Sequence, residues 1–415
     1  MIKKLKKVRF LLLGLLCIFI PSVILGFHNA TLYNPRHGFD GVGHVFYIEY
    51  LFKHGNFPPP NLNWETHQPP LYYSIGAFLM MLTGTWKIAQ YINTAILWCI
   101  IGMVGLGLWK VFKKPYKVFI GMFALASLPM LNIFPAMITN ELLNTFWIIS
   151  SLVASIYLLS AKEKKIFFLY SIWLAVSLSL GLWTKMTIVT VAPILMLAYL
   201  QIFLNKFIKR KMILISVISV TSFVIIMSIP VLLRARSAAS PSDITRQVTK
   251  KLYFNSPEFY YRLDWIPKVD MYTTQYYSLL GGAWNSFWSD GHNAITPFVK
   301  FHKKAFILWT LGFFLLPLSI TGLIKMWKTN RLYAPIMYVT GIGMFLIYIY
   351  DNLAANHYSA VRLTYEMGIV VPYVFGLANI SQNKIAKTIL FVLIAIQFVT
   401  MISFFWIQSW WHVTK

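Results

Sequence analysis

The chain has 415 residues, of which 58% are hydrophobic, 17% aromatic and only 12% charged. This composition excludes two or three ordinary soluble domains and is typical of an integral membrane protein. The formal net charge of +25 does not indicate a nucleic-acid partner, because the basic residues stand in short clusters between apolar runs. Both cysteines, Cys17 and Cys99, lie inside apolar runs, so no disulfide framework is predicted.

Apolar runs long enough to cross a membrane recur along the whole chain. They lie at 10–26, 88–109, 118–136, 142–161, 166–183, 187–204, 212–233, 305–324, 333–350, 364–380 and 388–409. We therefore predict an all-α, polytopic integral membrane fold of about 11 transmembrane helices, which form a single membrane domain over residues 1–415. The basic start could belong to a secretory signal, but no small-residue cleavage site follows the first run, which favours an uncleaved helix.

The short links between the runs carry lysine and arginine, which places these links and the N-terminus in the cytoplasm. An odd number of crossings then puts the C-terminus outside. The apolar segment Leu71–Thr83 is too short to cross, and it follows Pro69 and Pro70, which suit the first turn of a helix. We expect it to form a helix on the outer membrane surface.

Two long segments interrupt the apolar pattern, and both are expected on the outer face. The first long loop, residues 27–87, concentrates charged and aromatic residues directly after the first run. The second long loop, residues 234–304, is rich in aromatic residues, as is typical of an interfacial loop or lid. In this topology Glu163 is the only acidic residue in a cytoplasmic link, so we expect the catalytic chemistry on the outer face, in the first long loop.

Asp40 is the first candidate catalytic residue, because an ionisable group at a membrane boundary is costly and is a functional candidate by default. Its carboxylate could act as a general base on an acceptor hydroxyl or amine, hold a divalent ion, or simply form a turn beside Gly41. His37, Asp40 and His44 share a helical spacing that could bind a metal, although the intervening glycines disfavour one continuous helix. A divalent metal is the one cofactor that this pattern allows, and none is required.

Further polar groups stand at the outer ends of other apolar runs. Asn140 and Glu141 begin one run, and they are either an ordinary helix start or a second acidic site that faces the first. Lys185 is a lone cation, and Arg362 precedes a later run with Glu366 one turn away. Such cations suit a phosphate, although Lys185 equally suits snorkelling to lipid headgroups and Arg362 an ion pair with Glu366.

The first long loop reads HGFDGVGHVFYIEYLFKHG and then NWETHQPPLYY. It resembles the dolichyl-phosphate-mannose protein mannosyltransferase-like glycosyltransferases, glycosyltransferase family 39 in the broad sense. That family has the membrane-embedded type C glycosyltransferase (GT-C) fold, an acidic residue in the first outer loop and a Pro-Pro-Leu-Tyr segment that opens a surface helix. The segments ITNELL, GLWTKMT and VRLTYEMGIVVP are similar to later elements of the family, so the resemblance covers most of the chain.

The resemblance implies transfer of a sugar from a polyprenyl-phosphate carrier to an acceptor. It makes Asp40 the base, Asn140 and Glu141 the second polar pair, and Lys185 and Arg362 holders of the lipid phosphate. Further candidates for substrate contacts in the first long loop are His44, Glu65, His67, Gln68 and Tyr72. A metal would use Asp40, His44 and Glu141.

The chain departs from the family pattern in three places. Asp40 is followed by Gly41 where the family often has Asp-Glu, and Asn140 or Glu141 stands in the second loop where the family commonly has Asp. His67 is one place away from the usual His-Pro-Pro. These departures leave metal dependence and the kind of acceptor open.

We therefore expect an integral membrane glycosyltransferase, in a bacterial inner or plasma membrane rather than the endoplasmic reticulum. Its partners would be a polyprenyl-phosphate sugar donor, a lipid, glycan or protein acceptor, and membrane lipids. Because the leaving group is already activated, a single displacement that inverts the anomeric configuration is favoured. Two other classes stay open: a lipid-linked-glycan transporter or flippase, for which we find no inverted repeat in the sequence, and a noncatalytic GT-C-like scaffold.

Overall fold

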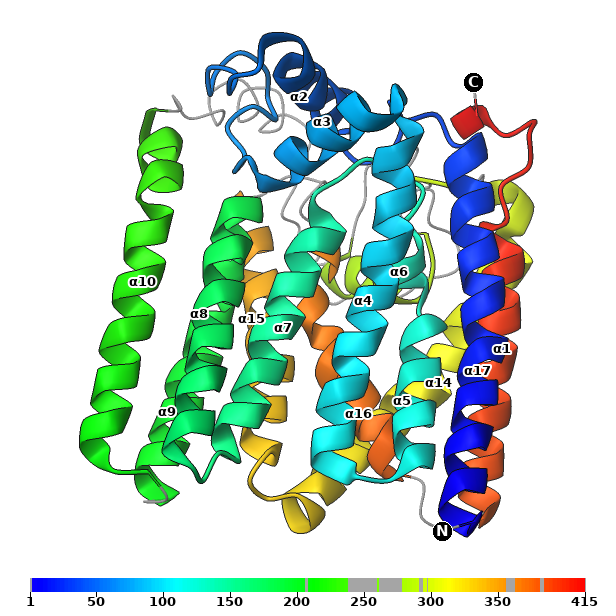
Figure 1. Ribbon diagram of the computed structural model, residues 1–415. Helices are drawn as coiled ribbons and strands as arrows, with labels where there is room; N and C mark the ends of the chain where they lie inside the picture. The colour runs from blue at the N-terminus through cyan, green and yellow to red at the C-terminus, as the bar shows by residue number, and fades with distance from the viewer. Residues whose placement is uncertain are drawn as a thin grey trace.

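The computed structural model describes residues 2–205, 208–237, 260, 278–290, 294–296, 298–355, 363–380 and 384–414, and every regular element within these ranges is a helix. The long helices form one bundle (Figure 1). The C-terminus lies at the end of the bundle that carries α2 (Gly41–His54) and α3 (Leu71–Thr83), here termed the loop end. The N-terminus lies at the other end, here termed the opposite end. The predicted all-α membrane fold is confirmed.

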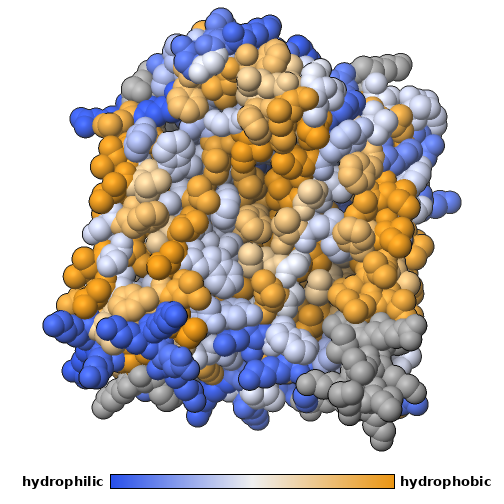
Figure 2. Space-filling model, in the orientation of Figure 1, coloured by the Kyte–Doolittle hydropathy of each residue, from blue (hydrophilic) through white to orange (hydrophobic). Residues whose placement is uncertain are grey.

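Ten helical segments in the described part of the chain are long and apolar enough to cross a membrane. On the face shown in Figure 2, hydrophobic residues cover the middle of the bundle and hydrophilic residues gather at its two ends. The ten segments comprise α1 (Ile2–Leu32), α4 (Lys87–Phe112), α7 (Glu141–Leu159), α8 (Lys164–Thr184), η1 (Met186–Val191) with α9 (Ala192–Asn205), α10 (Arg210–Ser237), α14 (Phe298–Thr329), α15 (Ala334–Ala355), η3 (Leu363–Ile369) with α16 (Val370–Ile380), and α17 (Lys384–Phe405). Each of them coincides with one of the predicted apolar runs. A single turn, η4 (His412–Thr414), follows α17.

The predicted run at 118–136 is not one helix, because prolines interrupt it. It forms α5 (Pro115–Ala126) and the short α6 (Pro129–Asn132), followed by a buried coil that leads to Glu141. Proline lacks the backbone N–H that continues a helix. The two termini lie at opposite ends of the bundle, which requires an odd number of crossings, so α5 and this coil add an eleventh pass to the ten helical ones (Figure 1).

Two amide side chains on α4 hold the coil that leads into α7. Gln90 Nε2 donates to the carbonyl of Ala136 at 2.5 Å, and Asn93 Nδ2 donates to the carbonyl of Met137 at 2.6 Å. Because a buried carbonyl without a partner is costly, these bonds replace those that a continuous helix would have made. They fix the position of the first turn of α7.

The surface helix predicted at Leu71–Thr83 is present with those bounds as α3. It ends at Gly84, whose φ of +68° is a conformation that glycine adopts without steric cost. α2 packs on α3 through the stacked rings of Tyr47 and Tyr73, whose centroids are 4.0 Å apart. With 14 and 13 residues, α2 and α3 are too short to cross a membrane.

The second long loop lies largely outside the described residues, so its role as a lid stays a prediction. Its described part contains α13 (Leu279–Trp288), whose Trp288 is fully buried. The Asp290 carboxylate, also buried, accepts hydrogen bonds from the backbone N–H groups of Ala294, Ile295 and Thr296 at 2.7–2.9 Å. This part of the loop is therefore closely packed against the bundle.

α14 and α16 approach each other so closely that both carry glycine at the contact. A Cβ atom on Gly322 would overlap the carbonyl oxygen of Gly376, and one on Gly376 would overlap the backbone of Ser319. Small residues permit this kind of close helix packing inside membranes. The contact fixes α16, and with it the buried segment η3 that precedes it.

We expect Gly322→Ala to lower the free energy of unfolding by at least about 1–3 kcal/mol, because the backbone carbonyl it meets cannot move aside as a flexible side chain would. The matched control is Gly343→Ala on α15, where an added Cβ meets nothing within 4 Å. Thermal unfolding of both variants in detergent compares them. Equal melting temperatures for the two variants would contradict the close contact.

Candidate active site

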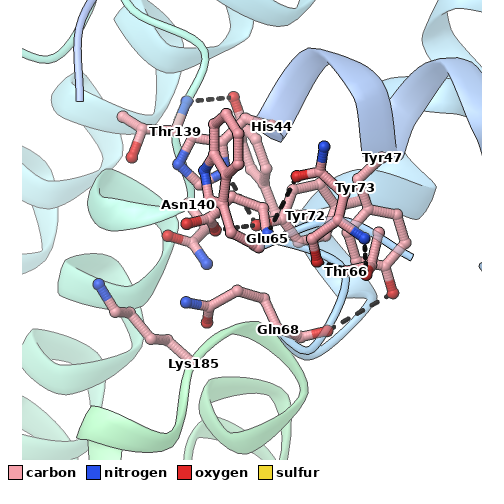
Figure 3. Close-up of polar contacts among 12 residues, drawn as sticks. His44, Tyr47, Glu65, Thr66, Gln68, Tyr72, Tyr73, Thr139, Asn140 and Lys185 are labelled. Atoms are coloured by element: carbon pink, nitrogen blue, oxygen red, sulfur yellow. Dashed lines mark hydrogen bonds and ion pairs between the residues drawn. The ribbon is translucent and has the colours of Figure 1, made fainter. Parts of the chain in front are cut away.

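Four segments that are distant in the sequence meet at the loop end. They are the turn before α2 with Asp40, the coil before α3 with Glu65 to Gln68, the start of α7 with Asn140 and Glu141, and Lys185 directly after α8. In Figure 3 the side chains of Gln68, Asn140 and Lys185 point into the same space between the first long loop and the ends of α7 and α8. The structure thus brings together most of the predicted site residues.

A buried ion pair joins the start of α7 to the end of α8. Lys185 Nζ lies 2.5 Å from Glu141 Oε1, and the two side chains are only 11% and 7% exposed. The extended backbone of Lys185, with φ of −164°, carries its side chain away from the axis of α8, and the ammonium also lies 4.8 Å from the ring centre of Tyr365. The two residues were predicted separately, and only the fold pairs them.

The second carboxylate oxygen of Glu141 is buried and accepts no hydrogen bond from the described residues. A buried acceptor without a donor is costly, so a ligand that offers a hydroxyl group fits at this position. Asn140 supports the pair, because its Nδ2 donates to the carbonyl of Thr184 at 3.3 Å and so holds α7 against α8. Asn140 therefore acts as a positioning residue for Glu141 and Lys185.

Glu65 lies in a second buried cluster with His44 and Tyr73 (Figure 3). His44 Nδ1 lies 2.9 Å from the Tyr73 hydroxyl and 3.5 Å from Glu65 Oε2, and the Tyr73 hydroxyl donates to Glu65 Oε2 at 3.4 Å. Gly43 makes room for this cluster, because a Cβ atom there would overlap the side chains of Glu65 and Trp64. The structure thus pairs His44 and Glu65 with each other.

The pKa of the Glu65 carboxyl is raised to about 8, first by burial and then by the nearby charge of Asp40. The charges of Lys185 and Glu141 act on it as well, in opposite directions. Glu65 therefore lies within electrostatic range of Asp40, Glu141 and Lys185. A carboxyl with this pKa is largely protonated at neutral pH, which reduces the negative charge that the site presents.

Asp40 precedes α2 in the left-handed conformation, with φ of +55°, and its side chain is exposed and does not cap the helix. Non-glycine residues in this conformation are uncommon and concentrate at functional sites. Asp40 is therefore not the ordinary helix-capping residue that its position would suggest. Its carboxylate is accessible at the edge of the buried groups.

Three other predicted substrate-binding residues have different surroundings. Tyr72 is buried, and its hydroxyl accepts hydrogen bonds from the Thr139 N–H at 3.1 Å and from Asn93 at 3.3 Å. It therefore links α3 to the coil before α7 and acts as a structural residue. His67 and Gln68 are partly exposed, and burial lowers the pKa of His67, so its imidazole is mainly neutral at pH 7.

Arg362 lies outside the described residues, so its role in phosphate binding stays a prediction. Glu366 is buried at a kink within η3, and it hydrogen-bonds to Asp351 of α15. The charges of Glu141 and Lys185 also act on Glu366. This acidic pair extends the candidate site into the bundle.

Two further residues contribute to the site although no motif or spacing in the sequence marks them. One is Asp351 of α15, the hydrogen-bond partner of Glu366. Arg234, at the end of α10, donates from Nη2 to the carbonyls of Pro58 and Thr66 at 2.7 and 2.6 Å, and so holds the coil that carries Glu65. In the sequence, Arg234 looks like any basic residue that flanks a membrane-spanning run. No spacing in the sequence reveals its two carbonyl partners.

Metal binding stays a prediction. Across the described ranges, no three His, Cys, Asp or Glu side chains come together in a group that could hold a metal ion. In particular, His44 is turned towards Glu65 and Tyr73.

Comparison with known proteins identifies the fold. No protein-family profile and no curated protein sequence matches the chain. The structure is similar to that of ArnT from Cupriavidus metallidurans bound to undecaprenyl phosphate, with a TM-score of 0.58, 12% identity, and coverage of 91% of this chain and 62% of that one. It is also similar to the apo oligosaccharyltransferase of Archaeoglobus fulgidus, with a TM-score of 0.60, 13% identity, and coverage of 96% and 56%.

A second structure of that oligosaccharyltransferase, in complex with Zn and sulfate, is similar with a TM-score of 0.54, 14% identity, and coverage of 93% and 53%. The chain therefore spans only 53–62% of the length of these neighbours. All are membrane enzymes of the GT-C class, so the chain has the GT-C fold, as the first long loop predicted.

Loss of one partner from the Glu141–Lys185 pair would leave the other charge buried and uncompensated. We expect Lys185→Met to lower the free energy of unfolding by about 3 kcal/mol, and we expect Glu141→Gln in the same chain to recover part of that loss. A double-mutant cycle of thermal or denaturant unfolding in detergent gives the coupling energy. The exposed pair Arg36–Glu49 is the control, and its coupling energy should be close to zero. A coupling energy as small for Glu141–Lys185 would contradict the buried pair.

The raised pKa of Glu65 predicts a pH-dependent stability. In the unfolded chain the carboxyl ionises near its ordinary pKa of 4.5, whereas in the folded chain it keeps its proton up to about pH 8. The unfolded state therefore binds fewer protons in this window, and the free energy of unfolding falls as the pH rises from about 4.5 to about 8. Melting temperatures of the wild type and Glu65→Gln at pH 5 and pH 8 test this. An equally steep fall in the variant would show that another group is responsible.

Proposed function

We propose that the protein is a membrane glycosyltransferase that moves a sugar from a polyprenyl-phosphate donor to an acceptor on the outer face of the membrane. One observation carries this proposal: an accessible carboxylate, Asp40, stands at the edge of a buried group that contains a single described lysine, Lys185, at the loop end of a GT-C fold. A base and a phosphate-holding cation are what such a transfer requires.

In this mechanism Asp40 removes the proton from the acceptor hydroxyl or amine as that atom attacks the anomeric carbon. The new bond forms between the acceptor atom and the sugar, and the bond between the sugar and the phosphate oxygen breaks. The electron pair of the broken bond goes to the phosphate, whose charge Lys185 stabilises. A single displacement of this kind inverts the anomeric configuration.

Glu141 and Glu65 adapt the site to an anionic donor. Glu141 holds the Lys185 ammonium in place, and its unpaired oxygen is available to accept a hydrogen bond from a sugar hydroxyl. Glu65, largely protonated at neutral pH, adds little negative charge next to the phosphate. Without this proton, the carboxylates around Lys185 would repel the donor.

The similar structures support this class of donor and acceptor. One of them, ArnT, is bound to undecaprenyl phosphate, and another is an oligosaccharyltransferase. The basic links between the apolar runs support a position of the loop end on the outer face. We propose a bacterial inner or plasma membrane as its location and a lipid, glycan or protein as its acceptor.

Replacement of Asp40 tests the proposal. We expect Asp40→Asn to reduce sugar transfer by about 10²–10⁴-fold, the usual contribution of a general base, while the amount and melting temperature of the protein stay the same. Mass spectrometry of lipids and glycans from cells with and without the protein first identifies the product, and the same product is then measured for each variant.

Glu49→Gln is the matched control, because Glu49 is also an acid of the first long loop but pairs with exposed Arg36 at 3.2 Å. It should transfer sugar at the wild-type rate. Unchanged transfer by Asp40→Asn would remove Asp40 from the chemistry. Absence of any altered glycan or lipid in cells without the protein would instead favour a noncatalytic scaffold.

A further inference from the structure

At the opposite end of the bundle, four lysines gather from three helices. Lys114 and Lys117 stand at the start of α5, Lys325 lies near the end of α14, and Lys387 lies in the first turn of α17. These helices and α16 pack against one another there. The proposed sugar transfer makes no use of this group, which lies at the other end of the molecule (Figure 1).

Lys117 is the centre of the group and is only 5% exposed. Its ammonium donates to Asn379 Oδ1 at 2.7 Å and lies 4.4 Å from the ring centre of Phe112. Asn379, on α16, in turn donates to the carbonyl of Gly322 at 3.0 Å and to Thr329 at 3.2 Å. Lys117 is therefore held in place by the close contact between α14 and α16.

The other three lysines lie within electrostatic range of this ammonium, because the charges of Lys114, Lys325 and Lys387 all act on it. Lys387 is fixed against α5, because its ammonium lies 4.3 Å from the ring centre of Tyr116. Within the part of the chain that the structure describes, none of the ion pairs includes any of these four lysines.

Four ammonium groups repel one another, so their convergence is unfavourable unless an anion compensates it. A general preference for basic residues on the cytoplasmic side explains lysines in exposed links. It does not explain why Lys117 is buried at a position where the charges of three further lysines act on it. The arrangement fits a bound phosphate group.

Exposed apolar residues adjoin the lysines along the same helices. Ile324 precedes Lys325 on α14 and is 59% exposed, while Ile385 and Ile389 flank Lys387 on α17 and are 72% and 53% exposed. Both helices are long and apolar enough to cross the membrane, so their ends lie at the level of the lipid headgroups. Apolar surface next to the cations suits acyl chains attached to the phosphate, which a free phosphate ion lacks.

From these contacts we propose that the four lysines bind the headgroup phosphate of an anionic membrane lipid, with its acyl chains along α14 and α17. Basic pockets between membrane helices are the usual form of such sites. The inference is independent of the proposed sugar transfer. It predicts a specific lipid contact at the opposite end of the bundle.

The test uses the purified full-length protein in detergent, titrated with phosphatidylglycerol. Lipid retention is measured by native mass spectrometry and by the rise in melting temperature. The variant Lys114→Gln/Lys387→Gln removes two charges from the site without touching buried Lys117. We expect it to bind about thirtyfold more weakly than the wild type, from the usual contribution of two lysines near an anionic headgroup. If this double variant does not fold, each single variant should bind about fivefold more weakly.

The matched control is Lys209→Gln/Lys211→Gln, which removes two exposed charges beside the start of α10. This control should bind phosphatidylglycerol as tightly as the wild type does. Neither the wild type nor the control should bind phosphatidylcholine tightly. Equal weakening in this control would show that only total charge matters and would overturn the site. Wild-type affinity in the Lys114→Gln/Lys387→Gln variant would overturn it too. An equal stabilisation by inorganic phosphate would overturn the assignment to a lipid.

Discussion

The buried contact between the Lys185 ammonium and the Glu141 carboxylate is the interaction around which the loop end is built. A desolvated ion pair contributes little net stability, because removal of both ions from water costs about as much as their attraction returns. The protein nevertheless fixes this pair from several sides. Asn140 ties α7 to α8, and Tyr72 ties α3 to the coil that begins α7. So much support for an interaction of small net benefit is consistent with the catalytic role that we propose for this site.

The same site also has to solve a problem of charge. Glu65, Glu141 and Glu366 all lie within reach of one lysine, and Asp40 stands at the edge. Four ionised carboxylates would repel the anionic donor that we propose. Burial solves part of the problem for Glu65, because it raises the pKa of that carboxyl to about 8 and keeps its proton in place at neutral pH. The cluster of Glu65 with His44 and Tyr73 is therefore part of the electrostatics of the site.

The two ends of the bundle have opposite electrostatic character for one physical reason. At the loop end, carboxylates act on Lys185, whereas at the opposite end the charges that act on Lys117 are those of lysines. The sugar-phosphate donor that we propose needs a cation with a base nearby, whereas the lipid headgroup that we propose needs cations alone. The glycine contact between α14 and α16 supports both ends, since it positions Asn379 at one and the segment η3 at the other.

The sequence by itself determined the membrane class, ten of the crossings, the bounds of the surface helix at Leu71–Thr83 and the GT-C fold. Each of these follows from local properties, namely the length of apolar runs, proline at helix starts and a recognisable loop motif. The break in the run at 118–136 was not predicted. That prediction followed the apolar content of the run and took no account of Pro129 and Pro135 within it.

Only the tertiary structure decided which side chains meet. In the structure Lys185 pairs with Glu141, and Glu65 contacts His44 and Tyr73. Tyr72 links α3 to the coil before α7, and Arg234 at the end of α10 binds the coil that carries Glu65. The loops that carry these residues are separated by whole membrane crossings. Nothing in the local sequence records how helices pack across that distance, because packing depends on the shapes of all the faces at once.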